Sequence, residues 1–332
     1  MERDRPGCCQ TAPRARARRN AIRTFVIVNP MAGNGRAAAR WPAISAMAGD
    51  AFGPFAHAFT ERPGHATELA REAVSRGMER IVAVGGDGTA NEVANGLMLA
   101  PAGRGPVPGL AVIPCGTGSD FCRSLDVRSG PAAAIARIAG STGRRIDVGL
   151  AEFHDTGGNR LRRHFINIAT FGLSGTISAR INDRTRAALL PGPVRYLTGT
   201  LGALARYQPP RMRLWIDGTM IERDLYLAAV ANACFFGGGM RIAPEAKLDD
   251  GLFDIVILDA IPRMRLARKI ARVYRGTHLA EPEITCMRGS HVIAQTVSPD
   301  ACQSGLLDLD GENPGMLRAE FRILPKALRL LM

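Results

Sequence analysis

The feature that most constrains this chain is a glycine-rich segment, GGDGTANEVANG, that runs from Gly85 to Gly96. It follows the β-branched run Ile81–Val84 and leads into a helical pattern. Closely spaced glycines permit backbone dihedrals that other residues avoid, and the N–H groups at the start of a helix face an anion. The carboxylate of Asp87 needs a cation, a metal-bound water or a hydroxyl as its partner. An ordinary strand-to-helix turn is the alternative interpretation, because a short glycine-rich loop is weak evidence by itself.

Two more glycine-containing loops follow apolar runs. The run Thr24–Val28 leads into Asn29-Pro-Met-Ala-Gly-Asn-Gly35, and the run Leu110–Ile113 leads into Pro114-Cys-Gly-Thr-Gly118. Strand and helix patterns alternate here, which predicts an α/β unit with a parallel sheet. In such a sheet the three loops emerge at one carboxyl edge, where ligands bind. We therefore predict a nucleotide there, although none of the loops has the P-loop or the dinucleotide fingerprint.

The pattern changes at about Ile146, where short alternating runs predict a sheet-rich second domain. The first domain has predicted helices near 37–47, 66–76 and 131–139. Predicted strands of the second part are 145–151, 164–169, 212–216, 225–230, 253–258, 306–310 and 317–324, with helices near 184–207 and 263–275.

Composition narrows the class of protein. A chain of 332 residues exceeds one ordinary hydrophobic core, so two domains are expected. The net charge of +13 favours an anionic partner. Charge alone does not decide whether that partner is phosphate, nucleic acid or an acidic membrane face. Residues 1–20 are rich in arginine and are predicted to be a disordered basic tail, interpreted as a solvated extension, a misassigned start, a membrane contact or a nucleic-acid contact. Seven cysteines without disulfide or metal spacing favour a reducing compartment, and the absence of a long apolar run predicts only peripheral membrane contact.

Taken together, the motifs resemble the catalytic domain shared by diacylglycerol, sphingosine and ceramide kinases and their bacterial lipid kinase relatives. The resemblance rests on Asn29-Pro30 with Gly33, on the GGDGT loop with Asn91-Glu92, and on GTGSDF from Gly116. It covers the chain from about Thr24 to the C-terminus. It implies a Rossmann-like α/β nucleotide-binding domain followed by a C-terminal β-sandwich domain, an NAD-kinase-like two-domain plan. The expected boundaries are 21–145 for the ATP-binding domain, 146–319 for the lipid-substrate domain, and 320–332 for a segment that returns to the first domain.

The resemblance also implies which residues contact ATP. They are Asn29, Thr60, Gly86, Asp87, Gly88, Thr89, Ala90, Asn91, Glu92 and Thr117. One position departs from the family pattern, because Ser119 stands where the bacterial relatives most often have asparagine. We expect nucleotide binding to survive and the local hydrogen bonding to differ.

An acidic turn, Pro244 to Asp254, precedes a predicted strand. Hard cations such as Mg²⁺ bind carboxylate and carbonyl oxygens in turns of this kind. The resemblance implies a structural Mg²⁺ held by the side chain of Asp250 and by backbone carbonyls at Lys247 and Leu252. A plain Asp-Asp-Gly hairpin turn is the alternative.

A second acidic segment, Asp308-Leu-Asp-Gly-Glu312, resembles the late D-G-E segment of the family. By that resemblance Glu312 is the catalytic base on the lipid hydroxyl, and Asp310 and Asp87 organise catalytic Mg²⁺ and water. Phosphoryl transfer otherwise depends on positioning and on cations that neutralise phosphate charge. A solvated acidic hairpin is the alternative interpretation.

The sequence therefore predicts an ATP-dependent lipid kinase that transfers the γ-phosphate of Mg-ATP to a lipid hydroxyl. Diacylglycerol is the default acceptor, and sphingoid bases, ceramide and phosphatidylglycerol stay open. An NAD kinase is the nearest rival, since it shares the GGDG loop and the Asn-Glu pair, and a catalytically silent nucleotide or lipid sensor is a third hypothesis. The expected partner is a lipid at the inner face of the membrane, reached from the cytoplasm by peripheral contact. No nucleic-acid partner is expected, and a homodimer stays open.

Overall fold

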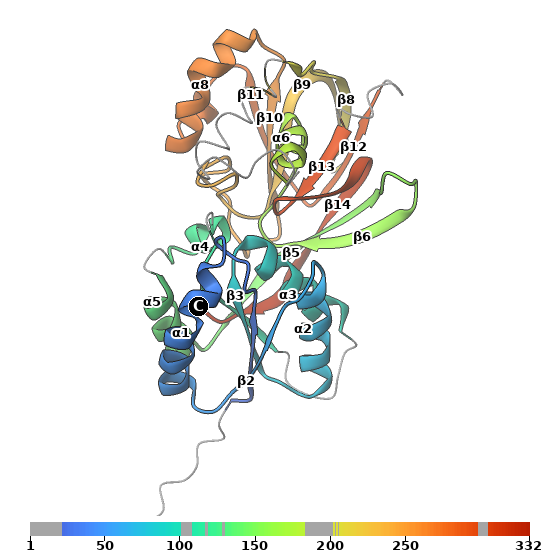
Figure 1. Cartoon of the computed structure of the whole chain (residues 1–332). Helices are drawn as coiled ribbons and strands as arrows, with labels where there is room; N and C mark the ends of the chain where they lie inside the picture. Colours follow the sequence, from blue (N-terminus) through green and yellow to red (C-terminus); the bar gives the residue numbers. More distant parts are fainter. Residues whose placement is uncertain are drawn as a thin grey trace, which may run out of the picture.

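A parallel sheet covered by helices forms the first domain (Figure 1). The computed structural model describes residues 22–100, 108–116, 119–127, 130–182, 202, 204, 206–297 and 305–332. The sheet has the order β4 (Gly109–Pro114), β3 (Arg80–Gly85), β1 (Thr24–Val28) and β2 (Ala56–Phe59), all parallel. The helices are α1 (Arg36–Phe52), α2 (His65–Ser75), α3 (Asp87–Leu99), α4 (Asp120–Ser124) and α5 (Gly130–Gly140). Helix α1 contacts α5 and helix α2 contacts α3, so the two pairs cover opposite faces of the sheet (Figure 1).

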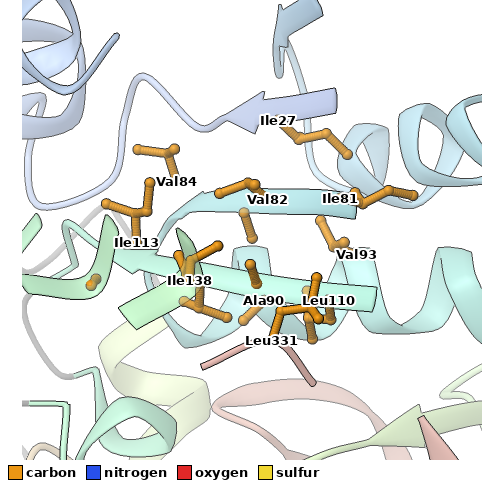
Figure 2. Packing of buried hydrophobic residues seen from close by; sticks show 14 of the residues in the cluster. Ile27, Ile81, Val82, Val84, Ala90, Val93, Leu110, Ile113, Ile138 and Leu331 are labelled. Atoms are coloured by element: carbon orange, nitrogen blue, oxygen red, sulfur yellow. The ribbon is translucent and has the colours of Figure 1, made fainter. Parts of the chain in front are cut away.

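The core of this domain explains why its strands read as continuous apolar runs. Figure 2 shows the branched side chains of Ile27, Val82 and Ile113 packed with residues of α3 and α5, and each is fully buried. Strands covered by helices on both faces bury both sets of alternating side chains. Leu331 also packs into this core (Figure 2), so the last residues of the chain belong to it spatially.

The second domain is built from antiparallel strands. They are β5 (Arg144–His154), β6 (Arg160–Phe165), β7 (Ile168–Gly172), β8 (Arg211–Ile216), β9 (Thr219–Ala231), β10 (Phe253–Asp259), β11 (Ile284–Gly289), β12 (His291–Thr296), β13 (Leu306–Leu309) and β14 (Glu312–Leu330). Helices α6 (Leu173–Asn182) and α8 (Arg263–Arg275) and the short 3-10 helix η1 (His278–Ala280) accompany them.

Two long strands join the layers of this β-sandwich. Strand β9 pairs with β8 near its start and with β7 and β10 near its end, and β14 pairs in turn with β13, β12 and β5. Because β8 also pairs with β12, six strands form a closed ring of hydrogen-bonded neighbours. The order around the ring is β9, β7, β13, β14, β12, β8 and back to β9. Aromatic rings fill the interior, where Phe171 stacks on Phe321 with centroids 6.1 Å apart.

Strand β14 also connects the two domains. Beyond its pairing with β5, its end runs parallel to β4, where Leu330 pairs with Leu110. The result is one continuous hydrogen-bonded network of strands that extends from the first domain into the second (Figure 1).

Most predicted elements are present, but one predicted strand is wrong. Residues 164–169 are not continuous, because the chain turns at Ile166 and Asn167 between β6 and β7. The backbone amides of that turn bind the carboxylate of Asp310, which a strand ladder would not permit. Helices α4 and α6 and strands β11 and β12 were not predicted, whereas the helix at 263–275 is confirmed as α8. The basic tail 1–20 and nearly all of the segment 184–207 lie outside the described residues.

Among the described residues, no helix combines the length and the apolar character needed to cross a bilayer.

Candidate active site

The three glycine-containing loops meet at the carboxyl edge of the parallel sheet. The amide of Cys115 donates to the carbonyl of Gly85 over 2.8 Å, and the amide of Asn29 donates to Val84 over 3.0 Å. A Cβ atom added at Gly116 would lie 2.6 Å from the Cα of Gly86, which is closer than real Cβ contacts allow. The loops therefore pack backbone against backbone, and only glycine fits at Gly116.

Polar side chains fasten these loops to one another. Asn29 donates from Nδ2 to Thr89 Oγ1 over 3.0 Å, and its Oδ1 accepts the amide of Met31. Helix α3 begins at Asp87, so its first turn opens at the same edge. A helix start beside glycine loops suits a phosphate. Asn29 and Gly86 through Ala90, predicted from the sequence as nucleotide contacts, are thus brought together.

The remaining predicted nucleotide contacts, which are Thr60, Asn91, Glu92 and Thr117, have other surroundings. The Asn91 side chain donates to Asp310 over 2.7 Å. Glu92 binds the start of α2, because its carboxylate accepts the amides of Gly64 and Ala66 over 2.9 and 3.0 Å. Thr60 follows β2 at the same sheet edge, and its amide donates to Val28. Thr117 lies outside the described residues. The nucleotide contacts predicted for these positions stay predictions.

Asp87 links the GGDG loop to the second glycine loop. Its carboxylate accepts the amides of Asp120 and Phe121 over 2.9 and 3.0 Å, at the start of α4. Burial raises the pKa of Asp87. Burial and the neighbouring Asp87 raise the pKa of Asp120 to about 6. Asp120 in turn accepts the amide of Gly238 over 2.7 Å, so α4 is tied to the second domain. Ser119, the departure from the family pattern, has a positive φ of 51° at this junction.

Asp310 holds the two domains together through its carboxylate. Its oxygens accept the amides of Ile166, Asn167 and Ile168 over 2.9 to 3.0 Å and the side-chain amide of Asn91 over 2.7 Å. Burial raises the pKa of Asp310 to about 6. Protein N–H donors thus surround both oxygens, and the predicted role of Asp310 in organising Mg²⁺ stays a prediction.

Glu312 reaches over the glycine loop from the second domain. A Cβ atom added at Gly88 would lie 3.4 Å from Glu312 Oε1, and the glutamate side chain is 40% exposed. Arg163 donates from Nη2 to Glu312 Oε2 over 2.5 Å and to Asn91 Oδ1 over 3.3 Å. The late DGE segment and the GGDG loop, far apart in sequence, therefore meet at one exposed carboxylate.

Sequence reasoning missed Arg163 and a fully buried aspartate, Asp147. The carboxylate of Asp147 accepts the amides of Gly251 and Lys326, each over 2.7 Å, and so joins the acidic turn to β14. A single aspartate inside the apolar run Arg145–Ala151 was the signal that could have identified it. Arg163 carried no such signal, because arginines occupy several neighbouring positions of its strand.

The acidic turn offers oxygen ligands of the kind that a hard cation prefers. Asp250 accepts the amide of Leu252 over 3.2 Å and forms an ion pair with Arg288. A cation at Asp250 would therefore compete with the Arg288 guanidinium. No cluster of three or more His, Cys, Asp or Glu ligands occurs in the part of the chain that the structure describes. The site predicted at Lys247, Asp250 and Leu252 stays a prediction.

Comparisons with known proteins agree with this arrangement. Residues 23–151 match the diacylglycerol kinase catalytic domain, and residues 168–332 match the YegS C-terminal NAD kinase beta sandwich-like domain. A diacylglycerol kinase of Bacillus subtilis is 31% identical over 270 residues, which is 81% of this chain and 82% of the relative. A probable lipid kinase YegS-like of Chromohalobacter salexigens is 37% identical over 211 residues, 62% of each chain. The crystal structure of a putative diacylglycerol kinase from Bacillus anthracis superposes with a TM-score of 0.72 at 26% identity, covering 93% of this chain and 97% of the other.

Proposed function

Because this chain belongs to the diacylglycerol kinase catalytic-domain family, it is an ATP-dependent lipid kinase, and we propose that it phosphorylates diacylglycerol to phosphatidic acid. The observation that carries the proposal is the position of Glu312, whose Oε1 lies against Gly88 of the glycine loop. At this position a carboxylate base from the second domain faces the glycine loop that would hold the transferred phosphate.

In the proposed reaction Glu312 takes the proton of the lipid hydroxyl. The hydroxyl oxygen bonds to the γ-phosphorus of ATP, the bond between that phosphorus and the β–γ bridging oxygen breaks, and ADP leaves. A base must lie within hydrogen-bond reach of the proton that it takes. Arg163, held between Glu312 and Asn91, orients the carboxylate.

The first domain, residues 21–145, is proposed to be Rossmann-like and to carry the nucleotide. The close loops at Gly86 and Gly116 and the start of α3 support this proposal. The contacts would come from Asn29, Thr60, Gly86 to Glu92 and Thr117. The lipid would bind residues 146–319, and residues 320–332 would complete the first domain through Leu330 and Leu331.

The family uses a divalent metal with ATP, and we propose Mg²⁺. It would neutralise phosphate charge during transfer. Asp87 and Asp310 are the proposed acidic residues near it, although each already accepts N–H donors of the protein. A second, structural Mg²⁺ is proposed at Asp250 with carbonyls of Lys247 and Leu252, where the oxygen ligand set supports it.

A test combines the purified protein with labelled ATP, Mg²⁺ and mixed micelles containing diacylglycerol, ceramide, sphingosine or phosphatidylglycerol, with NAD in a parallel reaction. We expect label in phosphatidic acid. Label in another lipid would replace the proposed acceptor, and label in NAD alone would contradict a lipid acceptor. The proposed location is the cytoplasmic face of the membrane by peripheral association, which fractionation of cells would check.

A further inference from the structure

Helix α8 lies on the outside of the second domain (Figure 1). The two sides of this helix differ chemically. Its sequence, RMRLARKIARVYR, is rich in cations and carries no acidic residue. Leu266 is buried against Tyr226 and Leu173 on the inner face. This packing fixes which side of the helix faces outward.

The flank of the helix nearest the sheet is fully paired with carboxylates. Lys269 donates to Glu283 over 2.7 Å and is also paired with Glu281. Arg265 pairs with Glu283 over 2.8 Å, and Arg272 pairs with Glu281. Both glutamates are buried, so these ion pairs attach the helix to the domain. The carboxylates of Glu281 and Glu283 are thereby already paired with Arg265, Lys269 and Arg272.

The outward face presents a different set of residues. Met264, Arg268, Ala271 and Arg275 follow one another at intervals of four, three and four positions, which places them on one line of a helix. All four are exposed, and the Met264 residue is 70% exposed. Among the described residues no carboxylate pairs with Arg268 or Arg275. We call these four residues the α8 stripe.

The end of α8 lies near the candidate active site. The carbonyl of Val273 accepts the amide of Arg241 over 3.0 Å, at the end of the loop that contains Gly238. Gly238 donates to Asp120 of α4, which begins beside Asp87. The C-terminal end of α8 is therefore connected, through Arg241, Gly238 and Asp120, to the loops proposed to hold the nucleotide.

We infer that the α8 stripe is the surface by which this protein docks on an anionic lipid bilayer. The charge is complementary, since unpaired arginines favour acidic lipid headgroups, and the exposed Met264 at the start of the stripe enters the interface. The inference rests on the proposed function only in that a lipid acceptor resides in a membrane. Docking itself requires no catalysis, so vesicle binding and kinase activity can fail separately.

The experiment measures co-sedimentation of the full chain with phosphatidylcholine vesicles, with and without phosphatidylglycerol. The test variant is Arg268→Glu with Arg275→Glu, and Met264→Ser is made separately. The charge-matched control is Arg71→Glu on α2 with Arg76→Glu at the residue that follows the helix, which changes the net charge equally at exposed positions, although Arg76 pairs with Glu72. Activity on a short-chain, water-soluble diacylglycerol reports that each variant is folded.

The wild-type protein should bind the anionic vesicles, and added salt should weaken the binding. The α8 reversal should lower the partition constant at least about tenfold, since each basic side chain contributes roughly a factor of five. Met264→Ser should lower it less, and the α2 control should retain binding. Equal loss in the α2 control, unchanged binding in the α8 variant, or no wild-type binding to anionic vesicles would each overturn the inference. Binding of acidic protein or nucleic acid without vesicle binding would do the same.

Discussion

Arg163 and Glu312 form an ion pair with 2.5 Å between Nη2 and Oε2, although they are 149 positions apart in the chain. The same guanidinium donates to Asn91 of α3 over 3.3 Å. Through this contact the carboxylate of the second domain acquires a fixed position above the glycine loop of the first. The following predictions test what depends on that position.

Glu312→Gln should lower kcat by about 10²–10⁴-fold, because an amide cannot accept the hydroxyl proton. Glutamine has the same shape, so the thermal unfolding midpoint should change little. Glu320→Gln is the control, since Glu320 lies on the same strand and pairs with His291 and Arg322 outside the site. Near-normal turnover in Glu312→Gln would remove the base role from that residue.

Arg163→Met should lower kcat by about 10–100-fold with little change in the KM for ATP, because a misplaced carboxylate slows transfer without altering nucleotide binding. Arg163→Lys should restore part of the loss by supplying one charged donor. The neighbouring Arg162 faces solvent and pairs with Glu152, so Arg162→Met should behave as wild type. Steady-state kinetics of the three variants measure kcat and the KM for ATP separately. A rise in the KM for ATP that accompanies the fall in kcat would indicate that Arg163 contacts the nucleotide instead.

Gly116→Ala should destabilise the protein by about 1–3 kcal/mol and raise the KM for ATP, because the new Cβ would meet the backbone of Gly86. Gly49→Ala is the contrast, since nothing lies within 4 Å of the new atom inside α1. It should stabilise the fold by about 0.5–1 kcal/mol. Chemical denaturation measures both changes. Equal tolerance of the two substitutions would mean that the loops do not pack as described.

Asp308→Asn should make stability less dependent on pH. Burial raises the pKa of Asp308 to about 7, above its ordinary value of 3.8, so the folded protein favours the protonated form. The contribution of Asp308 to folding stability is fully present at pH values below its ordinary pKa of 3.8 and is lost as pH rises through about 7. The variant should therefore gain roughly 1–4 kcal/mol relative to wild type at pH 8 and little at pH 4. A constant difference across that pH range would contradict the assignment.

Chelation should test the proposed cation at Asp250. Excess EDTA should lower the thermal midpoint of the wild-type protein, because a folded-state ligand is removed. It should have little effect on Asp250→Asn, which lacks the carboxylate, and its full effect on Asp249→Asn, the exposed neighbour. Equal responses of all three proteins would show that any stabilising cation binds elsewhere.

The sequence by itself determined the parallel sheet and its loops. Each signal there is local: a β-branched run such as Ile81–Val84 lies within a few residues of the glycines that follow it. Strand direction then brings Gly86 and Gly116 to one edge without knowledge of the rest of the chain. The acidic segment at Asp308 to Glu312 was also recognisable, because its residues are contiguous.

Only the tertiary structure decided what those acidic residues contact. Asp310 and Asn91 are 219 positions apart, and the split between β6 and β7 exists because the amides of Ile166 and Asn167 satisfy Asp310. Arg163 became distinct from Arg162 only through strand alternation, which directs one side chain to Glu312 and the next to Glu152. Local sequence propensity cannot identify a contact partner more than a hundred residues away, and it cannot identify the strand face on which a charged side chain lies. Both depend on how the β-sandwich packs against the first domain.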